Sequence, residues 1–111
     1  MLAARAADQK GGVDTVVLDV GDILAITDAF VITSAGNSRL VKAVVEEVES
    51  AVADAGGPKP RRVEGLGQLE WVLMDYGDFV VHVFLDEIRR FYELERLWSD
   101  VPRLAWATAD I

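Results

Sequence analysis

The clearest periodic pattern of apolar residues lies after residue 38. Apolar side chains recur there at the three- and four-residue spacing of an amphipathic helix: Val41, Val44, Val45, Val48, Val52 and Ala55. Charged residues occupy the opposite side. Either Asn37 or Ser38 can cap the first turn, and Gly56-Gly57-Pro58 ends the helix. The pattern predicts a helix over 38–55 with one face in the core.

Four runs of β-branched and aromatic residues are too short for helices and predict strands. They span residues 15–20, 29–34, 71–76 and 79–85. The dipeptide Gly77-Asp78 separates the last two runs and predicts a tight hairpin turn. Residues 59–67 contain too many glycines and prolines for a central strand, so we expect a loop there with at most a short edge strand.

Two further helices are expected near the ends of the chain. The alanine-rich residues 1–10 predict a short helix that ends at Gly11-Gly12. Asp86 can cap a last helix that ends before Pro102. Its core-facing residues are expected to be Ile88, Phe91, Leu94, Leu97 and Trp98. This order of elements predicts an α/β fold with a mixed β-sheet, because the hairpin is antiparallel and the crossover helix favours a parallel pair.

The composition indicates one soluble domain. The chain has 111 residues, of which 51% are hydrophobic, and it has no cysteine, so it can form a packed core but no thiol-based catalytic or metal site. We expect the domain to span 1–101 and a loosely held tail to span 102–111. No apolar run approaches the roughly 20 residues that cross a bilayer, and residues 1–10 lack the apolar region of a signal peptide. A cytoplasmic protein is expected.

The charge is strongly acidic and unevenly distributed. The formal net charge of −8 argues against a general nucleic-acid binder and against an anionic membrane surface, but it leaves a basic protein partner open. Between Val63 and Ile88 there is no lysine or arginine. The acidic residues of that stretch are Glu64, Glu70, Asp75, Asp78, Asp86 and Glu87.

Few side chains offer catalytic chemistry. His82 is the single histidine and lies in an apolar strand, so a structural role is favoured over catalysis or metal binding. Ser34 and Ser38 flank a strand-to-helix turn that matches neither a phosphate-binding loop nor a nucleophile elbow, which favours a capping role.

The carboxylates leave one enzymatic alternative open. Asp19, Asp22 and Asp28 lie near strand ends, and Asp75 and Asp78 flank the hairpin turn, where turn chemistry is the favoured reason for aspartate. In the alternative, two or three of these aspartates hold Mg²⁺ in a nucleotidyltransferase-like enzyme. The Gly-Ser helix start and the Asp-x-Asp strand of such enzymes are absent from the sequence, and no catalytic constellation can be assembled.

The strand over 71–76 presents two different faces. Trp71, Leu73 and Asp75 alternate onto one face, and Val72, Met74 and Tyr76 alternate onto the other. If the first face points outward, it has the composition of a protein interface, with an aromatic anchor beside a charge; otherwise Trp71 is a core residue. Periodicity alone leaves both possibilities open. Two residues of the last helix that lie off its apolar stripe could join this surface, namely Tyr92 and Glu95.

The segments 70–84 and 90–98 resemble the signature of the ribosomal silencing factor family, also called RsfS or Iojap. The first reads EWVLMDYGDFVVHVF and the second RFYELERLW. Earlier stretches agree in order and spacing: Val17-Leu18-Asp19-Val20, Thr27-Asp28-Ala29-Phe30-Val31-Ile32, Ser38-Arg39, Val41-Lys42-Ala43 and Glu64-Gly65. The resemblance covers about residues 3 to 101.

This resemblance implies a mixed sheet flanked by helices, similar to the nucleotidyltransferase fold but without its catalytic motif. It implies a protein without cofactor or enzymatic activity that binds large-subunit ribosomal protein fourteen, blocks association of the ribosomal subunits and represses translation when nutrients are scarce. A homodimer is also implied. Matched onto this chain, the contact residues are Trp71, Leu73, Asp75, Tyr76, Tyr92 and Glu95.

Overall fold

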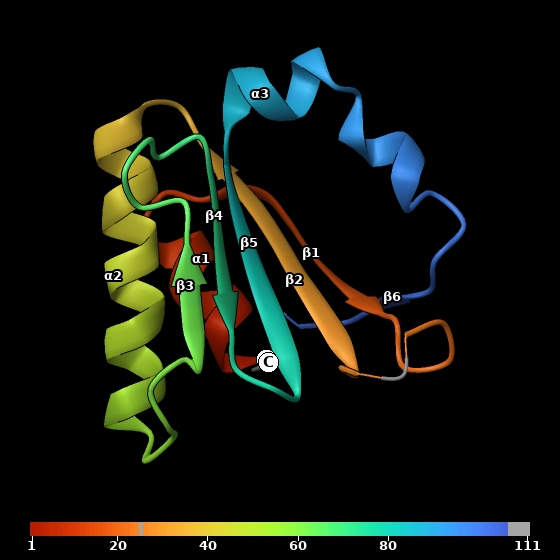
Figure 1. The fold of residues 1–111 in the computed structure, drawn as a ribbon, viewed down its shortest axis with the longest axis horizontal. Coiled ribbons are helices and arrows are strands. Elements are labelled where there is room, and N and C mark those ends of the chain that lie inside the picture. The colour runs from red at the N-terminus through yellow and green to blue at the C-terminus, as the bar shows by residue number, and fades with distance from the viewer. Residues whose placement is uncertain (25, 107–111) are drawn as a thin grey trace.

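The computed structural model describes residues 1–24 and 26–106, which fold around one six-stranded sheet (Figure 1). The strands are β1 (Val13–Asp19), β2 (Ala29–Ala35), β3 (Arg62–Glu64), β4 (Trp71–Asp75), β5 (Phe79–Leu85) and β6 (Arg103–Leu104). The helices are α1 (Leu2–Gln9), α2 (Ser38–Asp54), α3 (Asp86–Phe91) and the short 3₁₀ helix η1 (Leu94–Leu97). None of the helices in these residues is long and apolar enough to cross a membrane.

The sheet is mixed, as the sequence predicted. Its strand order is β3-β4-β5-β2-β1-β6. The central strands β2 and β5 run parallel, with Ala29 opposite Phe79 and Ala35 opposite Leu85, whereas the other neighbours are antiparallel. The crossover from β2 to β5 contains α2, the edge strand β3 and its neighbour β4, so the predicted hairpin and the predicted parallel pair are both present.

Helices α1 and α2, which the sequence predicted, pack on the same face of the sheet (Figure 1). The valine stripe of α2 is fully buried against β2, β4 and β5, and the alanines of α1 pack into the same core. Asn37, rather than Ser38, caps α2, since its side-chain oxygen accepts a hydrogen bond from the Leu40 N–H at 2.8 Å. This arrangement puts most of the hydrophobic core on one side of the sheet.

The opposite face has much thinner cover. Residues 92–101, which we call the C-terminal segment, run along that side of the sheet after α3 (Figure 1). A second, smaller apolar cluster lies beneath it and consists of Leu18, Val20, Ile32, Phe84 and Trp98. Because this cluster involves β1, β2 and β5 only, the segment leaves β4 uncovered.

The prediction of one long last helix is wrong. The α-helix ends at Phe91, Glu93 adopts a left-handed backbone with φ of 49°, and η1 follows. Glu95 folds back onto Arg89, a contact that a continuous helix excludes because residues six apart are not neighbours on its surface. Phe91 and Leu97 are therefore exposed and only Trp98 of the expected stripe is buried; the side chain of Leu94 lies outside the described residues.

Two smaller expectations about the last third of the chain also change. Asp86 is the first residue of α3 and caps nothing with its side chain, since the N-cap position is Leu85. The expected loose tail begins as part of the sheet, because β6 pairs with β1 and the Trp106 indole N–H donates to the Thr15 carbonyl at 3.2 Å. Residues 102–106 thus belong to the packed domain, and residues 107–111 lie outside the described part.

Candidate functional site

The structure decides which face of β4 points outward. Val72 and Met74 are fully buried against the helices, whereas the Trp71 side chain on the other face is 50% exposed. Leu73 and Asp75 beside it are partly exposed. We call these three residues of β4 the open face. Its outward orientation follows from the placement of α1 and α2, which cover only the opposite side of the sheet.

Trp71 is exposed but held in a fixed orientation. It lies opposite Phe84 in the β4–β5 ladder, with the two ring centroids 5.0 Å apart. Its indole N–H donates a hydrogen bond to Nδ1 of His82 at 3.1 Å. An aromatic side chain that is both half-exposed and hydrogen-bonded in place can bind a partner without losing much conformational freedom.

His82 supports this geometry as a neutral ring. It is buried beside Phe30, at a centroid distance of 4.7 Å, and burial lowers the pKa of His82 to about 4. Nδ1 accepts the Trp71 hydrogen bond, so the single proton of the neutral ring is on Nε2. The sequence favours a structural role for His82, and in the structure that role is to orient the Trp71 indole on the open face.

Tyr92 lies beside the open face. Its exposed side chain and that of Trp71 line one groove of about 570 Å³, together with Ile88 and Leu97. Phe91 packs edge-on against Tyr92, with centroids 4.9 Å apart, and is also exposed. Sequence reasoning missed Phe91 and Leu97 as surface residues because it assigned both to the core stripe of a continuous helix.

Carboxylates border the apolar part of this surface. Glu70 lines the groove shared by Trp71 and Tyr92, and Glu64 lines a second groove beside Trp71 and Leu73. Glu64 also forms an exposed ion pair with Arg62 at 3.0 Å. The site is thus an aromatic patch with an acidic border, which suits a basic partner more than an acidic one.

Tyr76 is separated from the other expected contact residues. It is buried on the helix-covered side of the sheet and stacks on Phe79 with ring centroids 4.8 Å apart. Burial, and to a smaller extent the Glu49 carboxylate, raises the pKa of Tyr76 to about 12. Tyr76 therefore belongs to the core, and the surface that contains Trp71, Leu73, Asp75 and Tyr92 does not include it.

The aspartates are used in turns. The Asp75 carboxylate accepts the Gly77 N–H at 2.8 Å inside the hairpin turn, and the Asp19 carboxylate accepts the Gly21 N–H at 3.3 Å. Over residues 1–24 and 26–106 no group of three or more acidic, histidine or cysteine side chains is placed to hold a metal ion. The form of the Mg²⁺ alternative that uses three of these aspartates therefore has no such group in this part of the chain.

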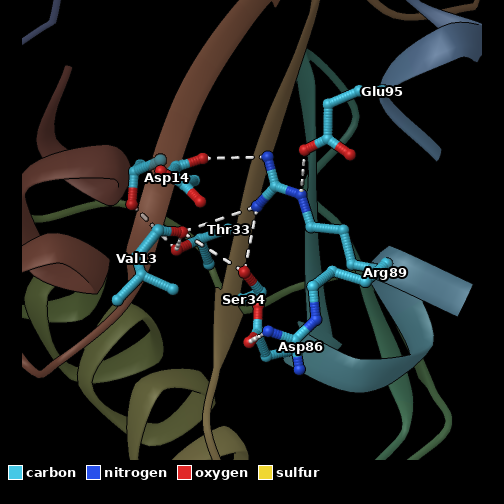
Figure 2. Close-up of polar contacts among 9 residues, drawn as sticks. Val13, Asp14, Thr33, Ser34, Asp86, Arg89 and Glu95 are labelled. Carbon is cyan, nitrogen blue, oxygen red and sulfur yellow. Dashed lines mark hydrogen bonds and ion pairs between the residues drawn. The ribbon is translucent and has the colours of Figure 1, made fainter. Parts of the chain in front are cut away.

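Glu95 forms an ion pair with Arg89 that the sequence did not predict. Figure 2 shows its carboxylate on the guanidinium of Arg89, where Oε2 accepts the Nε–H at 2.7 Å. Arg89 is only 3% exposed. Its other nitrogens donate to Ser34 Oγ at 3.0 Å and to the carbonyl of Asp14 at 3.0 Å. Glu95 therefore fastens the C-terminal segment to the sheet.

An irregularity in β1 makes this connection possible. The register of β1 against β2 shifts between Val13 and Val16, and Asp14 has a left-handed backbone with φ of 50°. Such a bulge frees backbone groups from the ladder, and here the carbonyls of Val13 and Asp14 point toward Arg89 (Figure 2). Arginine suits the position because its planar fork donates in several directions at once.

The fold and the surface together define an α/β protein with a mixed sheet whose helices α1 and α2 cover one side and leave Trp71 exposed on the other. The family model described as "Ribosomal silencing factor during starvation" matches residues 1–110, and the chain belongs to that family.

Individual relatives agree with this assignment. The chain is 39% identical to the ribosomal silencing factor RsfS of Bacillus subtilis, over 91% of this chain and 85% of that protein. It is 32% identical to mouse "Mitochondrial assembly of ribosomal large subunit protein 1", over 82% of this chain and 41% of that longer protein. A crystal structure of a Bacillus halodurans protein superimposes with a TM-score of 0.80 at 35% identity, covering 95% of this chain and 94% of that one.

We expect acid to destabilise the protein through His82. Its pKa is about 4 in the folded protein against 6.5 for the ordinary side chain, so the unfolded state takes up a proton that the folded state does not. The free energy of unfolding should fall as the pH drops from 6.5 to 4, by roughly 3 kcal/mol in all. Urea denaturation across this range measures it. The matched His82→Phe variant has no titrating ring, so its free energy of unfolding should not show this decrease. If both proteins show the same pH dependence, the assignment of the effect to His82 is contradicted.

We also expect Glu95 to stabilise the domain. Glu95→Gln leaves the buried Arg89 cation without a counter-charge and should lower the free energy of unfolding by about 1–2 kcal/mol. Glu93→Gln is the control, because Glu93 pairs with Arg96 at 3.2 Å with both side chains largely exposed, and such a pair contributes less than about 0.5 kcal/mol. Chemical denaturation of the two variants compares them directly, and equal losses would show that Glu95 has no special role.

Proposed function

We propose that this protein is a translational repressor that binds large-subunit ribosomal protein fourteen through the open face and Tyr92. In this role it acts in the cytoplasm when nutrients are scarce, uses no cofactor and catalyses no reaction. The observation that supports the proposal most strongly is the half-exposed Trp71, which His82 and Phe84 hold in place on a side of the sheet that neither α1 nor α2 covers.

The composition of the surface fits a ribosomal protein. Tryptophan and tyrosine are the residues that most often contribute large shares of binding energy at interfaces. Ribosomal proteins are usually basic, and the net charge of −8 with Glu64 and Glu70 beside Trp71 is complementary to such a partner. The same charge disfavours direct contact with ribosomal RNA, so a protein is the more suitable point of attachment.

In this proposal the bound protein represses translation by steric exclusion alone. The domain measures 33 × 31 × 29 Å, whereas two surfaces in contact approach within about 4 Å of one another. A body of this thickness, attached where the small subunit docks, prevents the two subunits from meeting. No residue needs to perform chemistry, which agrees with the use of Asp19 and Asp75 in turns.

We expect Trp71→Ala to weaken binding to purified ribosomal protein fourteen by at least about 2 kcal/mol, or roughly thirtyfold in Kd. Half of the Trp71 side chain is exposed, so the domain should stay folded, which far-ultraviolet circular dichroism checks. The control is Leu104→Ala, which removes a 45%-exposed apolar side chain at the opposite edge of the sheet and should leave Kd unchanged. Isothermal titration calorimetry measures both. Unaltered affinity of the Trp71→Ala variant would refute the proposed surface.

A further inference from the structure

A cavity adjoins the open face on the same side of the sheet, and we call it the apolar hollow. Its volume is about 300 Å³, and Trp71 of the open face forms part of its wall. Other accessible parts of the wall come from two segments: Ile23 and Leu24 after β1, and Leu97 and Val101 of the C-terminal segment. The nearly inaccessible second apolar cluster lies beneath. None of the described residues that line the hollow is charged at neutral pH.

The rim of the apolar hollow is highly exposed for apolar side chains. Leu97 is 74% exposed, Ile23 is 63% exposed and Trp71 is 50% exposed. Large apolar side chains gathered around one hollow are typical of a surface that a partner covers. The volume of the hollow is roughly ten times the ~30 Å³ that one water molecule occupies, so a leucine or phenylalanine side chain can enter it. Burial of the rim by such a side chain is favourable, because it removes apolar surface from water.

The apolar hollow is continuous with the surface proposed to bind the ribosomal protein. Trp71 and Leu97 line both the hollow and the groove of about 570 Å³ that Tyr92 also lines. A partner that covers Trp71 and Tyr92 therefore reaches the edge of the hollow as well. One partner can occupy both without a second binding event.

The charges near the apolar hollow are acidic. Residues 11–38 include several aspartates but no lysine or arginine. Two of the carboxylates gather where the loop after β1 begins: Asp19 accepts the Gly21 N–H at 3.3 Å, and a Cβ added at Gly21 would lie 3.5 Å from Oδ1 of Asp28. Glu70 lines the adjoining groove. These charges attract a basic partner and repel a second copy of this chain, whose net charge is also −8.

We propose that the apolar hollow receives one apolar side chain of the basic ribosomal protein, flanked in that protein by lysine or arginine. The inserted side chain contacts Ile23, Trp71 and Leu97, and the flanking cations face the carboxylates of the loop after β1 and of Glu70. The binding surface then extends beyond the open face and Tyr92 to the connection between β1 and β2. This inference rests on the proposed function.

Matched substitutions in one connection test the proposal. Ile23→Ala shortens a side chain of the rim and should raise the Kd for purified ribosomal protein fourteen about tenfold. Ile26→Ala is the control, because Ile26 lies in the same connection and is 84% exposed but does not line the hollow. Its Kd should stay within about twofold of the unmodified value. Isothermal titration calorimetry with the 111-residue chain measures both, and circular dichroism checks that both variants are folded.

A filled hollow distinguishes insertion from simple apolar contact. Val101→Phe adds apolar surface to the wall but takes up space inside the hollow. If a side chain of the partner must enter, the Kd should rise at least about tenfold. If apolar area alone matters, the larger side chain should leave binding unchanged or make it tighter. Thermal unfolding checks that this variant is folded.

The Trp71→Ala variant separates failure of this inference from failure of the proposed function. This inference alone is overturned if Trp71→Ala weakens binding but Ile23→Ala does not, if Ile26→Ala weakens it as much as Ile23→Ala, or if Val101→Phe binds as well as the unmodified chain. Both are overturned if the unmodified chain does not bind ribosomal protein fourteen or if Trp71→Ala has no effect. A dimer of the chain alone that Ile23→Ala abolishes, measured by sedimentation equilibrium, would assign the hollow to a second copy and also overturn the proposal.

Discussion

The buried guanidinium of Arg89 is the interaction on which the second side of this fold depends. A cation that is 3% exposed is tolerated only where acceptors surround it. Here they come from three separate places: the bulge of β1, Ser34 at the end of β2, and Glu95 beyond α3. Arg89 thereby fixes where the chain goes after α3, and with it the positions of Tyr92 and Trp98.

The proposed binding surface is exposed because the helices cover the two sides of the sheet unequally. Both α1 and α2 pack on one side, and only the C-terminal segment lies on the other. That segment covers β1, β2 and β5 but leaves β4 bare, so Trp71 and Leu73 remain accessible. The exposed aromatic patch thus results from the limited cover that the C-terminal segment gives to this side of the sheet.

Much of this architecture could be predicted from the sequence, because it depends on patterns among residues that are close together in the chain. The valine spacing of α2, the hairpin turn at Gly77-Asp78 and the mixed sheet were all correctly predicted. The alternation of side chains over 71–76 correctly placed Trp71 and Tyr76 on opposite faces of the sheet. The same alternation does not indicate which of the two faces points outward. Only the placement of the helices on the Tyr76 side decides it, and that is a property of the whole fold.

The last helix shows where local patterns fail. Its apolar residues have helical spacing, yet the helix ends at Phe91 and Glu95 folds back onto Arg89, whose other partners lie far away in the sequence. Nothing in the sequence near Arg89 distinguishes it from a solvated surface arginine, since its partners Asp14 and Ser34 are 75 and 55 residues away. Periodicity does not detect contacts over such distances, so it predicts Phe91 and Leu97 in the core although both side chains are exposed.

Sedimentation of purified ribosomal subunits tests the central claim most directly. Large subunits are incubated with the protein in excess, small subunits are added, and the fraction of joined ribosomes is measured on a sucrose gradient. The account predicts that the protein sediments with the large subunit and that the joined fraction falls, with neither effect for Trp71→Ala. If the protein binds large subunits and the joined fraction stays the same as without it, the steric account is contradicted.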